Sequence, residues 1–345
     1  MKITRRNVLL AGAAGAACAG MGRLAWAQQG GRVVVGTWGG DYGSLLRENV
    51  DTAFSQASGI DVVQDIGTPD PRKTKILAER QGRRASMDVA FFNDTDAFLL
   101  GQQDLLTPID ANNVPRMAEV VPQLRKAYSI PHIYSFQVIL YNPAKIDPAP
   151  TSFADFWNPK WRGHIGFVDD MYRQVTIAAA LAGGGSITRF DPAWDKLLEL
   201  RELGAKVYSS NEALASAIKS EEIWMTTLYL SRGYMWKQGG LPLEHVVASE
   251  GAPIVAFEAV VPKNSRNQEG ALGYLNAVLG AQAQAAFAKK MGYLPTVQDA
   301  VLPPEIAKSI SLSAEQQQRL LVPDYDYSAR MNPQVLDFWT KQFKG

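Results

Sequence analysis

The sequence predicts an α/β protein built as two lobes that are joined by crossover strands. Three features of the 345-residue chain indicate this fold class. Short β-branched segments alternate with segments of helical spacing, which implies parallel strand pairing with helices packed on a sheet. Two unusually long extended passages, residues 132–143 and 254–262, divide the alternating pattern. The length of the chain also favours two domains over one.

The amino-terminal part of the pattern predicts three strands, each followed by a helix. The first strand is a β-branched run that Gly39 and Gly40 close, which is typical of a buried strand followed by a turn. Apolar residues from Leu46 to Phe54 then recur at helical spacing. The expected strands are 32–38, 60–65 and 87–92, and the expected helices are 44–56, 71–81 and 95–101.

The remainder of the chain predicts the second lobe and the return to the first. Ser152 with Asp155 three residues later forms a capping box at the start of a short helix. The other expected elements are strands at 163–170 and 223–226 and helices at 172–181, 194–203, 211–219 and 268–290. We expect lobe 1 to comprise residues 28–136 and 256–300, and lobe 2 to comprise residues 137–255 and 301–345 with the C-terminal helices. Strand ends of both lobes would face one cleft that hinge closure can bury.

Residues 1–27 have the three-part layout of an export signal. Arg5 and Arg6 precede a short apolar stretch, and a small-x-small cleavage pattern ends at Ala27. The adjacent arginines resemble a twin-arginine signal, which exports folded proteins. We therefore expect a periplasmic protein whose signal peptide is cleaved near Ala27. Sec export, an N-terminal anchor helix and lipidation at Cys18 are the alternatives.

Cleavage at Ala27 changes the composition of the chain in two ways. It removes four basic residues and no acid, so the remaining 318 residues carry 31 basic and 34 acidic side chains, a net charge of −3. It also removes Cys18, the one cysteine, which leaves no thiolate for a disulfide, a metal or catalysis. The near-neutral charge gives no electrostatic case for binding nucleic acid. No later apolar run reaches membrane-spanning length.

Four stretches of the chain match a known family in their order and spacing. They are Trp38 with Tyr42; Met87–Val89 leading to Leu105–Asp110; Ser129–Tyr134 through Tyr141–Asn142 to Phe153–Gly163; and Val261–Ser265 followed by Glu269–Ala271 and Met291–Thr296. In these stretches the sequence resembles the periplasmic solute-binding proteins of ABC importers, in the branch typified by spermidine/putrescine-binding proteins. The resemblance implies a type II periplasmic-binding-protein fold. It also implies a monomer without cofactor or metal that delivers a small solute to a membrane permease and its ATPase.

The resemblance further implies a site in which aromatic rings hold a methylene chain and carboxylates hold ammonium ends. Positions that match this polyamine pattern are Trp38, Asp41, Tyr42, Asp170 and Tyr293.

Other positions depart from the polyamine pattern. Arg173 stands where polyamine binders have a second acid, and Val255 and Phe257 stand where they have a tryptophan and an aspartate. Asn93 and Thr95 replace a serine and a tyrosine after the third strand. Glu258 could supply the missing acid only if the strand register slipped by one residue, which would turn it to the other face.

The pair of Asp170 and Arg173 indicates a different solute. A guanidinium suits a carboxylate and an aspartate suits an ammonium group, so the pair predicts an amino acid or an ω-amino acid. Tyr229, near the end of a strand, is well placed to contribute. Two alternatives stay open: the pair could be structural, bonded together or capping the following helix, or the solute could be a polyamine.

Several other features have structural interpretations that we favour. Trp157, Trp224 and Trp236 are expected in the core, His132 as a hydrogen-bonded structural residue, and the basic helix at 72–84 as a solvated face. Tyr325-Asp326-Tyr327 could be part of a ferric-ion or oxyanion site, the alternative function within the same fold.

The motifs of common enzyme classes are missing from the sequence. We find no Gly-x-Ser-x-Gly, no His-Glu-x-x-His, no P-loop and no Gly-x-Gly-x-x-Gly after the first strand. We therefore expect no catalytic residue, and a secreted α/β enzyme without a recognisable motif is the alternative of another class.

Overall fold

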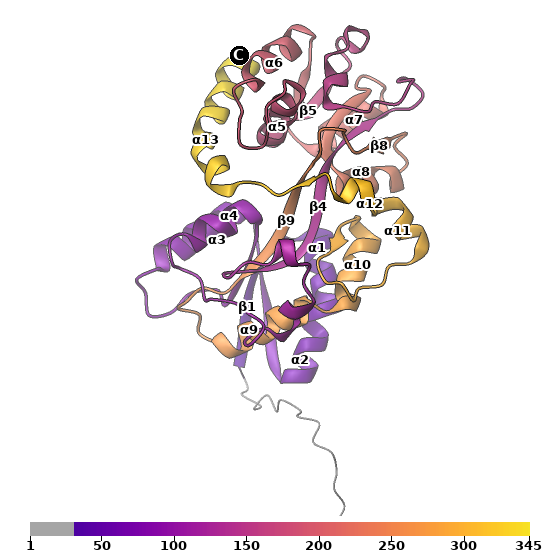
Figure 1. Ribbon diagram of the computed structural model, residues 1–345. Helices are drawn as coiled ribbons and strands as arrows, with labels where there is room; N and C mark the ends of the chain where they lie inside the picture. Colours follow the sequence, from indigo (N-terminus) through magenta and orange to yellow (C-terminus); the bar gives the residue numbers. More distant parts are fainter. Residues whose placement is uncertain (1–30) are drawn as a thin grey trace, which may run out of the picture.

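The computed structural model describes residues 31–345, so the predicted export signal lies outside the described residues. Figure 1 shows two α/β bodies, one above the other, with β4 and β9 running through both. β4 (Ile130–Tyr141) and β9 (Ala252–Val260) are the two long extended passages predicted from the sequence. Within the described part of the chain, no helix is long and apolar enough to cross a membrane.

The lobe that contains the amino-terminal strands is built on one mixed sheet with the order β10-β4-β9-β3-β1-β2. β1 (Gly31–Thr37) pairs in parallel with β2 (Ile60–Ile66) and with β3 (Val89–Asn93). β9 is antiparallel to β3, and β4 is antiparallel to β9. The short β10 (Leu294–Pro295) closes the edge beside β4. The parallel strands were predicted; the two antiparallel returns carry the chain between the lobes.

The strands of the second lobe are built on the far half of β4. Residues 137–141 of β4 pair with β7 (Met225–Tyr229), and residues 139–141 pair with β8 (Glu244–Val246). β5 (Gly166–Val168) and β6 (Lys206–Tyr208) form a separate parallel pair. A bridge between Ile165 and Met225 joins that pair to β7. Because β4 pairs with strands of both lobes, the exact lobe boundaries at residues 136 and 255 stay a prediction.

Helices cover both lobes. In the first lobe they are α1 (Gly40–Leu46), α2 (Thr52–Ser58), α3 (Pro69–Glu79), α4 (Asp94–Gly101), α9 (Gln268–Val278) and α10 (Ala281–Met291). In the second they are α5 (Tyr172–Ala182), α6 (Ala193–Glu202), α7 (Asn211–Lys219) and α8 (Leu230–Gln238). A π-helical turn at Arg47–Asp51 joins α1 to α2, so the helix predicted at 44–56 is one continuous rod from residue 40 to residue 58.

Three predicted elements differ from the structure. The helix expected at 268–290 is two helices, because Gly280 takes an extended conformation between α9 and α10, and glycine is a weak helix former. The strand expected at 163–170 spans only β5 and ends in a 3-10 turn at Asp169–Met171. The strand expected at 223–226 begins at Met225 and extends to Tyr229. The capping box of Ser152 and Asp155 is confirmed.

The C-terminal segment connects the lobes a third time. It contains α11 (Pro304–Ile310), α12 (Ala314–Gln317), β11 (Leu320–Leu321) and α13 (Tyr325–Phe338). β11 pairs with the start of β9, and Trp339, just after α13, is buried in the core of the second lobe. Tyr325, at the start of α13, instead reaches the first lobe and bonds to Asp94 of α4.

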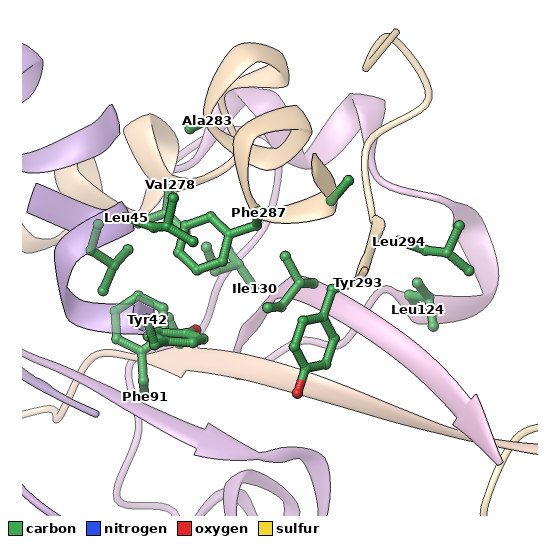
Figure 2. Close-up of a cluster of buried hydrophobic side chains, with 14 of the residues drawn as sticks. Tyr42, Leu45, Phe91, Leu124, Ile130, Val278, Ala283, Phe287, Tyr293 and Leu294 are labelled. Atoms are coloured by element: carbon green, nitrogen blue, oxygen red, sulfur yellow. The ribbon is translucent and has the colours of Figure 1, made fainter. Parts of the chain in front are cut away.

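The core of the first lobe contains a group of packed aromatic rings. Figure 2 shows Tyr42, Phe91 and Phe287 packed together beside Ile130. The rings of Tyr42 and Phe287 lie 5.1 Å apart, centre to centre, and meet edge to face, an orientation that the aromatic quadrupole favours. This core fixes the strand ends from which the candidate site is built.

Candidate solute-binding cleft

A cavity of about 610 Å³ lies between the lobes. The first lobe contributes residues at the ends of β1 and β3 and from the middle of β9. The second contributes β4, the end of β7, the turn before α5, the start of α5, and α13. Lining residues central to the site are Trp38, Asn93, Asp94, Thr95, Asp96, Gln137, Asp170, Arg173, Gln174, Tyr229, Val255 and Phe257.

Aromatic rings form one wall of the cleft. Trp38 follows β1, and its ring meets the ring of Phe257 edge to face at 5.2 Å. The Arg72 guanidinium lies 5.4 Å from the centre of the Trp38 ring, within reach of a cation–π attraction. Arg72 is only 4% exposed and donates a hydrogen bond to the Gly67 carbonyl oxygen at 2.9 Å. The prediction that the basic helix is a solvated face is therefore wrong for Arg72, which supports the aromatic wall.

The carboxylates on the first-lobe wall are occupied by protein groups. Asp96 accepts a bond from the Lys73 ammonium at 2.6 Å. Asp94 accepts bonds from the Ala256 backbone N–H at 3.0 Å and from the Tyr325 hydroxyl at 3.1 Å. Burial raises the pKa of Asp94, while the nearby positive charge of Lys126 opposes that rise. Asp70, the third acid on this wall, pairs with the Lys73 ammonium at 3.4 Å. Each of these acids is therefore already bonded to a protein group.

The second-lobe wall carries Asp170 and Arg173 in the turn before α5 and in its first turn. Among the described residues, no carboxylate lies within 4.0 Å of the Arg173 guanidinium, and its buried Nε has no hydrogen-bond partner. Helix α5 has neither a side-chain cap nor an acid in its first turn. The alternative that the two residues bond to each other is therefore wrong. Asp170 does lie in the 3-10 turn that leads into α5, where the helix dipole favours an acid, so a structural role for Asp170 at this helix start stays a prediction.

Asp170 and Tyr229 complete this wall. Burial and the charge of neighbouring Asp169 raise the pKa of Asp170, whereas Arg232 lowers it. The Tyr229 hydroxyl accepts a bond from the Gln174 side chain at 2.6 Å, which leaves its own proton available. Burial and the charge of Asp94 raise the pKa of Tyr229, and the charge of Arg173 opposes them.

Seven of the predicted site residues line this cleft: Trp38, Asn93, Thr95, Asp170, Arg173, Tyr229 and Phe257. Four do not: Asp41, Tyr42, Glu258 and Tyr293.

These four lie outside the cleft for separate reasons. Asp41 is exposed in the first turn of α1. Tyr42 is buried behind Trp38 and bonds to His132 at 2.8 Å. Tyr293 is 8% exposed and packs behind the Phe257 ring at 5.1 Å.

Glu258 lies on the opposite face of β9 from Phe257, as strand alternation requires. It is 0% exposed, pairs with the Lys126 ammonium and accepts a bond from the Ser129 hydroxyl. The possibility that Glu258 replaces a missing carboxylate in the cleft is therefore wrong for this structure.

The remaining predictions concern residues away from the cleft wall. His132 is buried and bonded to Tyr42, which confirms its structural role. None of the three tryptophans expected in the core lines the cleft, and Trp236 is buried at 8% exposure. Tyr325 and Tyr327 contact different parts of the protein. The Tyr325 hydroxyl donates to Asp94, whereas the Tyr327 hydroxyl accepts a bond from the Phe190 N–H at 2.9 Å. No group of three or more metal-ligating side chains occurs in residues 31–345.

Sequence reasoning missed Gln137 and Gln174, two amides on the second-lobe wall. Gln137 is a polar residue inside the apolar crossover strand β4, and that interruption was the available signal. Gln174 follows Arg173 in the first turn of α5.

A cleft between two α/β lobes, with crossover strands and polar groups at the strand ends, defines the type II solute-binding-protein fold. The chain matches the bacterial extracellular solute-binding protein family over residues 49–314, and it belongs to that family. This family supplies the substrate-binding components of ABC importers.

Individual relatives agree with this assignment. The spermidine/putrescine-binding periplasmic protein of Salmonella typhimurium is 26% identical over 280 residues, which cover 76% of this chain and 79% of that protein. The structure of a GABA receptor is 26% identical, with a TM-score of 0.78 and coverage of 90% of this chain and 96% of that chain. The fold is also that of a spermidine/putrescine-binding protein of Streptococcus pneumoniae, with a TM-score of 0.75, 20% identity and coverage of 91% and 99%.

Proposed function

We propose that this protein is the periplasmic receptor of an ABC importer, and that it binds a small solute carrying both an ammonium and a carboxylate group. Binding and hinge closure would present the solute to a membrane permease and its ATPase, without covalent chemistry. The solute class named here is an ω-amino acid or a related zwitterion.

The observation that carries this proposal is the unpaired Arg173 in the cleft wall. A guanidinium left without a carboxylate partner in a partly buried site is costly, so a ligand anion is the natural partner. Its planar fork matches a carboxylate with two parallel hydrogen bonds. The proton of the Tyr229 hydroxyl is a further donor on the same wall.

The rest of the cleft fits the other end of such a solute. Trp38 and Phe257 offer an apolar wall for methylene groups and a π face for an ammonium group. Asp170 offers a carboxylate for the same group. A polyamine, in contrast, needs a carboxylate at each end, and the other lining acids, Asp70, Asp94 and Asp96, are bonded to protein groups. The same relatives include polyamine and GABA binders, and Arg173 favours the second kind.

The proposal is tested by calorimetric titration of the Arg173→Ala variant with ω-amino acids of four to six carbons. Loss of a charge-assisted contact of about 1.5–3 kcal/mol should weaken binding roughly 10–150-fold. Arg173→Lys keeps the charge but loses the fork, so we expect an intermediate affinity.

Arg83→Ala is the matched control, because Arg83 is exposed and outside the cleft. Its affinity should equal that of the wild type. Equal affinities of Arg173→Ala and the control would overturn the assigned role of Arg173.

A further inference from the structure

The amide of Gln137 is the most constrained polar group in the cleft wall. Gln137 lies in β4 and is 0% exposed. Its Nε2 donates two hydrogen bonds, each of 2.9 Å, to the Gln174 carbonyl oxygen and to the Thr227 hydroxyl oxygen. Both protons of the amide nitrogen are therefore committed to the protein.

These partners fix which way the amide faces. The Thr227 hydroxyl donates its single proton to the Val138 carbonyl oxygen at 2.9 Å, so towards Gln137 it can only accept. The Gln174 carbonyl oxygen is also an acceptor. A flipped amide would set its oxygen against two acceptors and lose both bonds, so Oε1 is held on the side away from Thr227 and Gln174.

The Oε1 atom itself is unsatisfied. It is buried without a hydrogen-bond partner among the described residues, although Gln137 lines the cleft. Buried polar atoms are almost always paired, and an unpaired acceptor costs free energy. The group that would pair it must carry an N–H or O–H donor and must enter the cleft.

We propose that Gln137 Oε1 accepts a hydrogen bond from the amino end of the solute and makes the site specific for amines that carry N–H groups. This inference rests on the proposed function. It adds a selectivity that charge alone does not give, because Asp170 and the aromatic wall would attract a quaternary ammonium as well as a primary one. Gln137 Oε1 is a neutral acceptor held in one orientation, so it can bond only to an N–H or O–H donor. A trimethylated amine has no N–H group, so we expect the trimethylated analogue of the solute to bind more weakly.

The test uses the ω-amino acid of four to six carbons that the wild type binds most tightly, and two analogues. In one analogue a methyl group replaces the amine, and in the other the amine is trimethylated. Calorimetry gives the affinity ratio of the amine to each analogue, for the wild type and for Gln137→Leu. We expect Gln137→Leu to lower the ratio of amine to methyl analogue by roughly 10–150-fold, while the affinity for the methyl analogue stays within about threefold of the wild type.

Two further measurements separate this role from damage to the fold. Thr227→Val removes one partner of Nε2 but leaves Oε1 in place, so its ratio of amine to methyl analogue should equal that of the wild type. The wild type alone should bind the trimethylated analogue at least tenfold more weakly than the amine, a result that needs no variant.

Equal amine-to-methyl ratios in the wild type and Gln137→Leu would overturn this inference and leave the proposed function standing. Failure of the wild type to bind any ω-amino acid would overturn the proposed function and this inference together.

Discussion

Replacing Lys126 with methionine should destabilise the protein through Glu258, which lies beneath the cleft. Glu258 is 0% exposed, and its buried carboxylate pairs with the Lys126 ammonium. Methionine fills a similar volume but leaves the carboxylate without its cation. Removing one partner of a buried ion pair costs about 3–5 kcal/mol. Lys126 also lowers the pKa of Asp94, so its replacement also affects an acid on the first-lobe wall of the cleft.

The carboxyl can escape part of this penalty by taking up a proton. Burial already raises the pKa of Glu258 above its ordinary value of 4.5, and Lys126 is the main group that opposes the rise. Protonating such a group at pH 7 costs about 3.4 kcal/mol, at roughly 1.36 kcal/mol per pH unit. This sets the expected loss for Lys126→Met at pH 7 near 3 kcal/mol.

Protonation of Glu258 also determines how the stability of the variant depends on pH. An acid whose pKa is raised on folding binds more protons in the folded chain than in the unfolded chain, so its contribution to stability rises as pH falls. At pH 5 the protonation cost drops to about 0.7 kcal/mol, and most of the deficit of Lys126→Met should disappear. The double variant with Glu258→Gln should recover part of the loss at pH 7, since no charge is left buried.

The assay is urea unfolding followed by circular dichroism at pH 7 and at pH 5. Lys145→Met is the control: the ammonium of Lys145 pairs at 2.6 Å with Glu221, whose side chain is 55% exposed, and such surface pairs contribute at most about 1 kcal/mol. A loss at pH 7 no larger than that of the control, or a loss that is undiminished at pH 5, would refute the reasoning.

Two other predictions concern the buried polar groups around the cleft. Burial lowers the pKa of His132 from 6.5 to about 3, so below pH 6.5 the unfolded chain binds a proton that the folded chain does not. This difference should cost about 2 kcal/mol of folding stability at pH 5. His132→Gln should therefore lose less stability than the wild type between pH 7 and pH 5 in unfolding measurements, and an equal loss would contradict a neutral, buried His132. Tyr325→Phe removes the hydroxyl that bonds to Asp94 at 3.1 Å while keeping the ring stacked on Phe98. We expect this variant to lose about 1.5–3 kcal/mol in the free energy of unfolding. Wild-type stability of the variant would contradict a structural link between α13 and the first lobe.

The sequence predicted the features that depend on local periodicity and on strand ends. β-branched runs identified β1, β2 and β3, and the two long apolar passages identified the crossover strands. Trp38 and Arg173 reached the cleft because each follows the end of a strand, where ligands of α/β sheets bind. These predictions required no knowledge of which helix packs on which strand.

The errors arose where tertiary packing decides the outcome. Arg72 belongs to a basic segment that is typical of a solvated helix, yet its guanidinium is buried beside Trp38. Tyr42 is only four residues from Trp38, but the helix turns its ring into the core and away from the cleft. The pairing of Glu258 with Lys126 joins positions 132 residues apart, and no local pattern encodes such a contact.

We propose that Arg173 makes the cleft a site for a solute with one ammonium and one carboxylate group. The most direct measurement is calorimetric titration of the wild-type protein with each ω-amino acid of four to six carbons and with the diamine of matching chain length, in which an aminomethyl group replaces the carboxylate. We predict that the tightest ω-amino acid binds at least tenfold more strongly than its matched diamine. Tighter binding of the diamine would contradict this proposal and indicate that the protein binds polyamines.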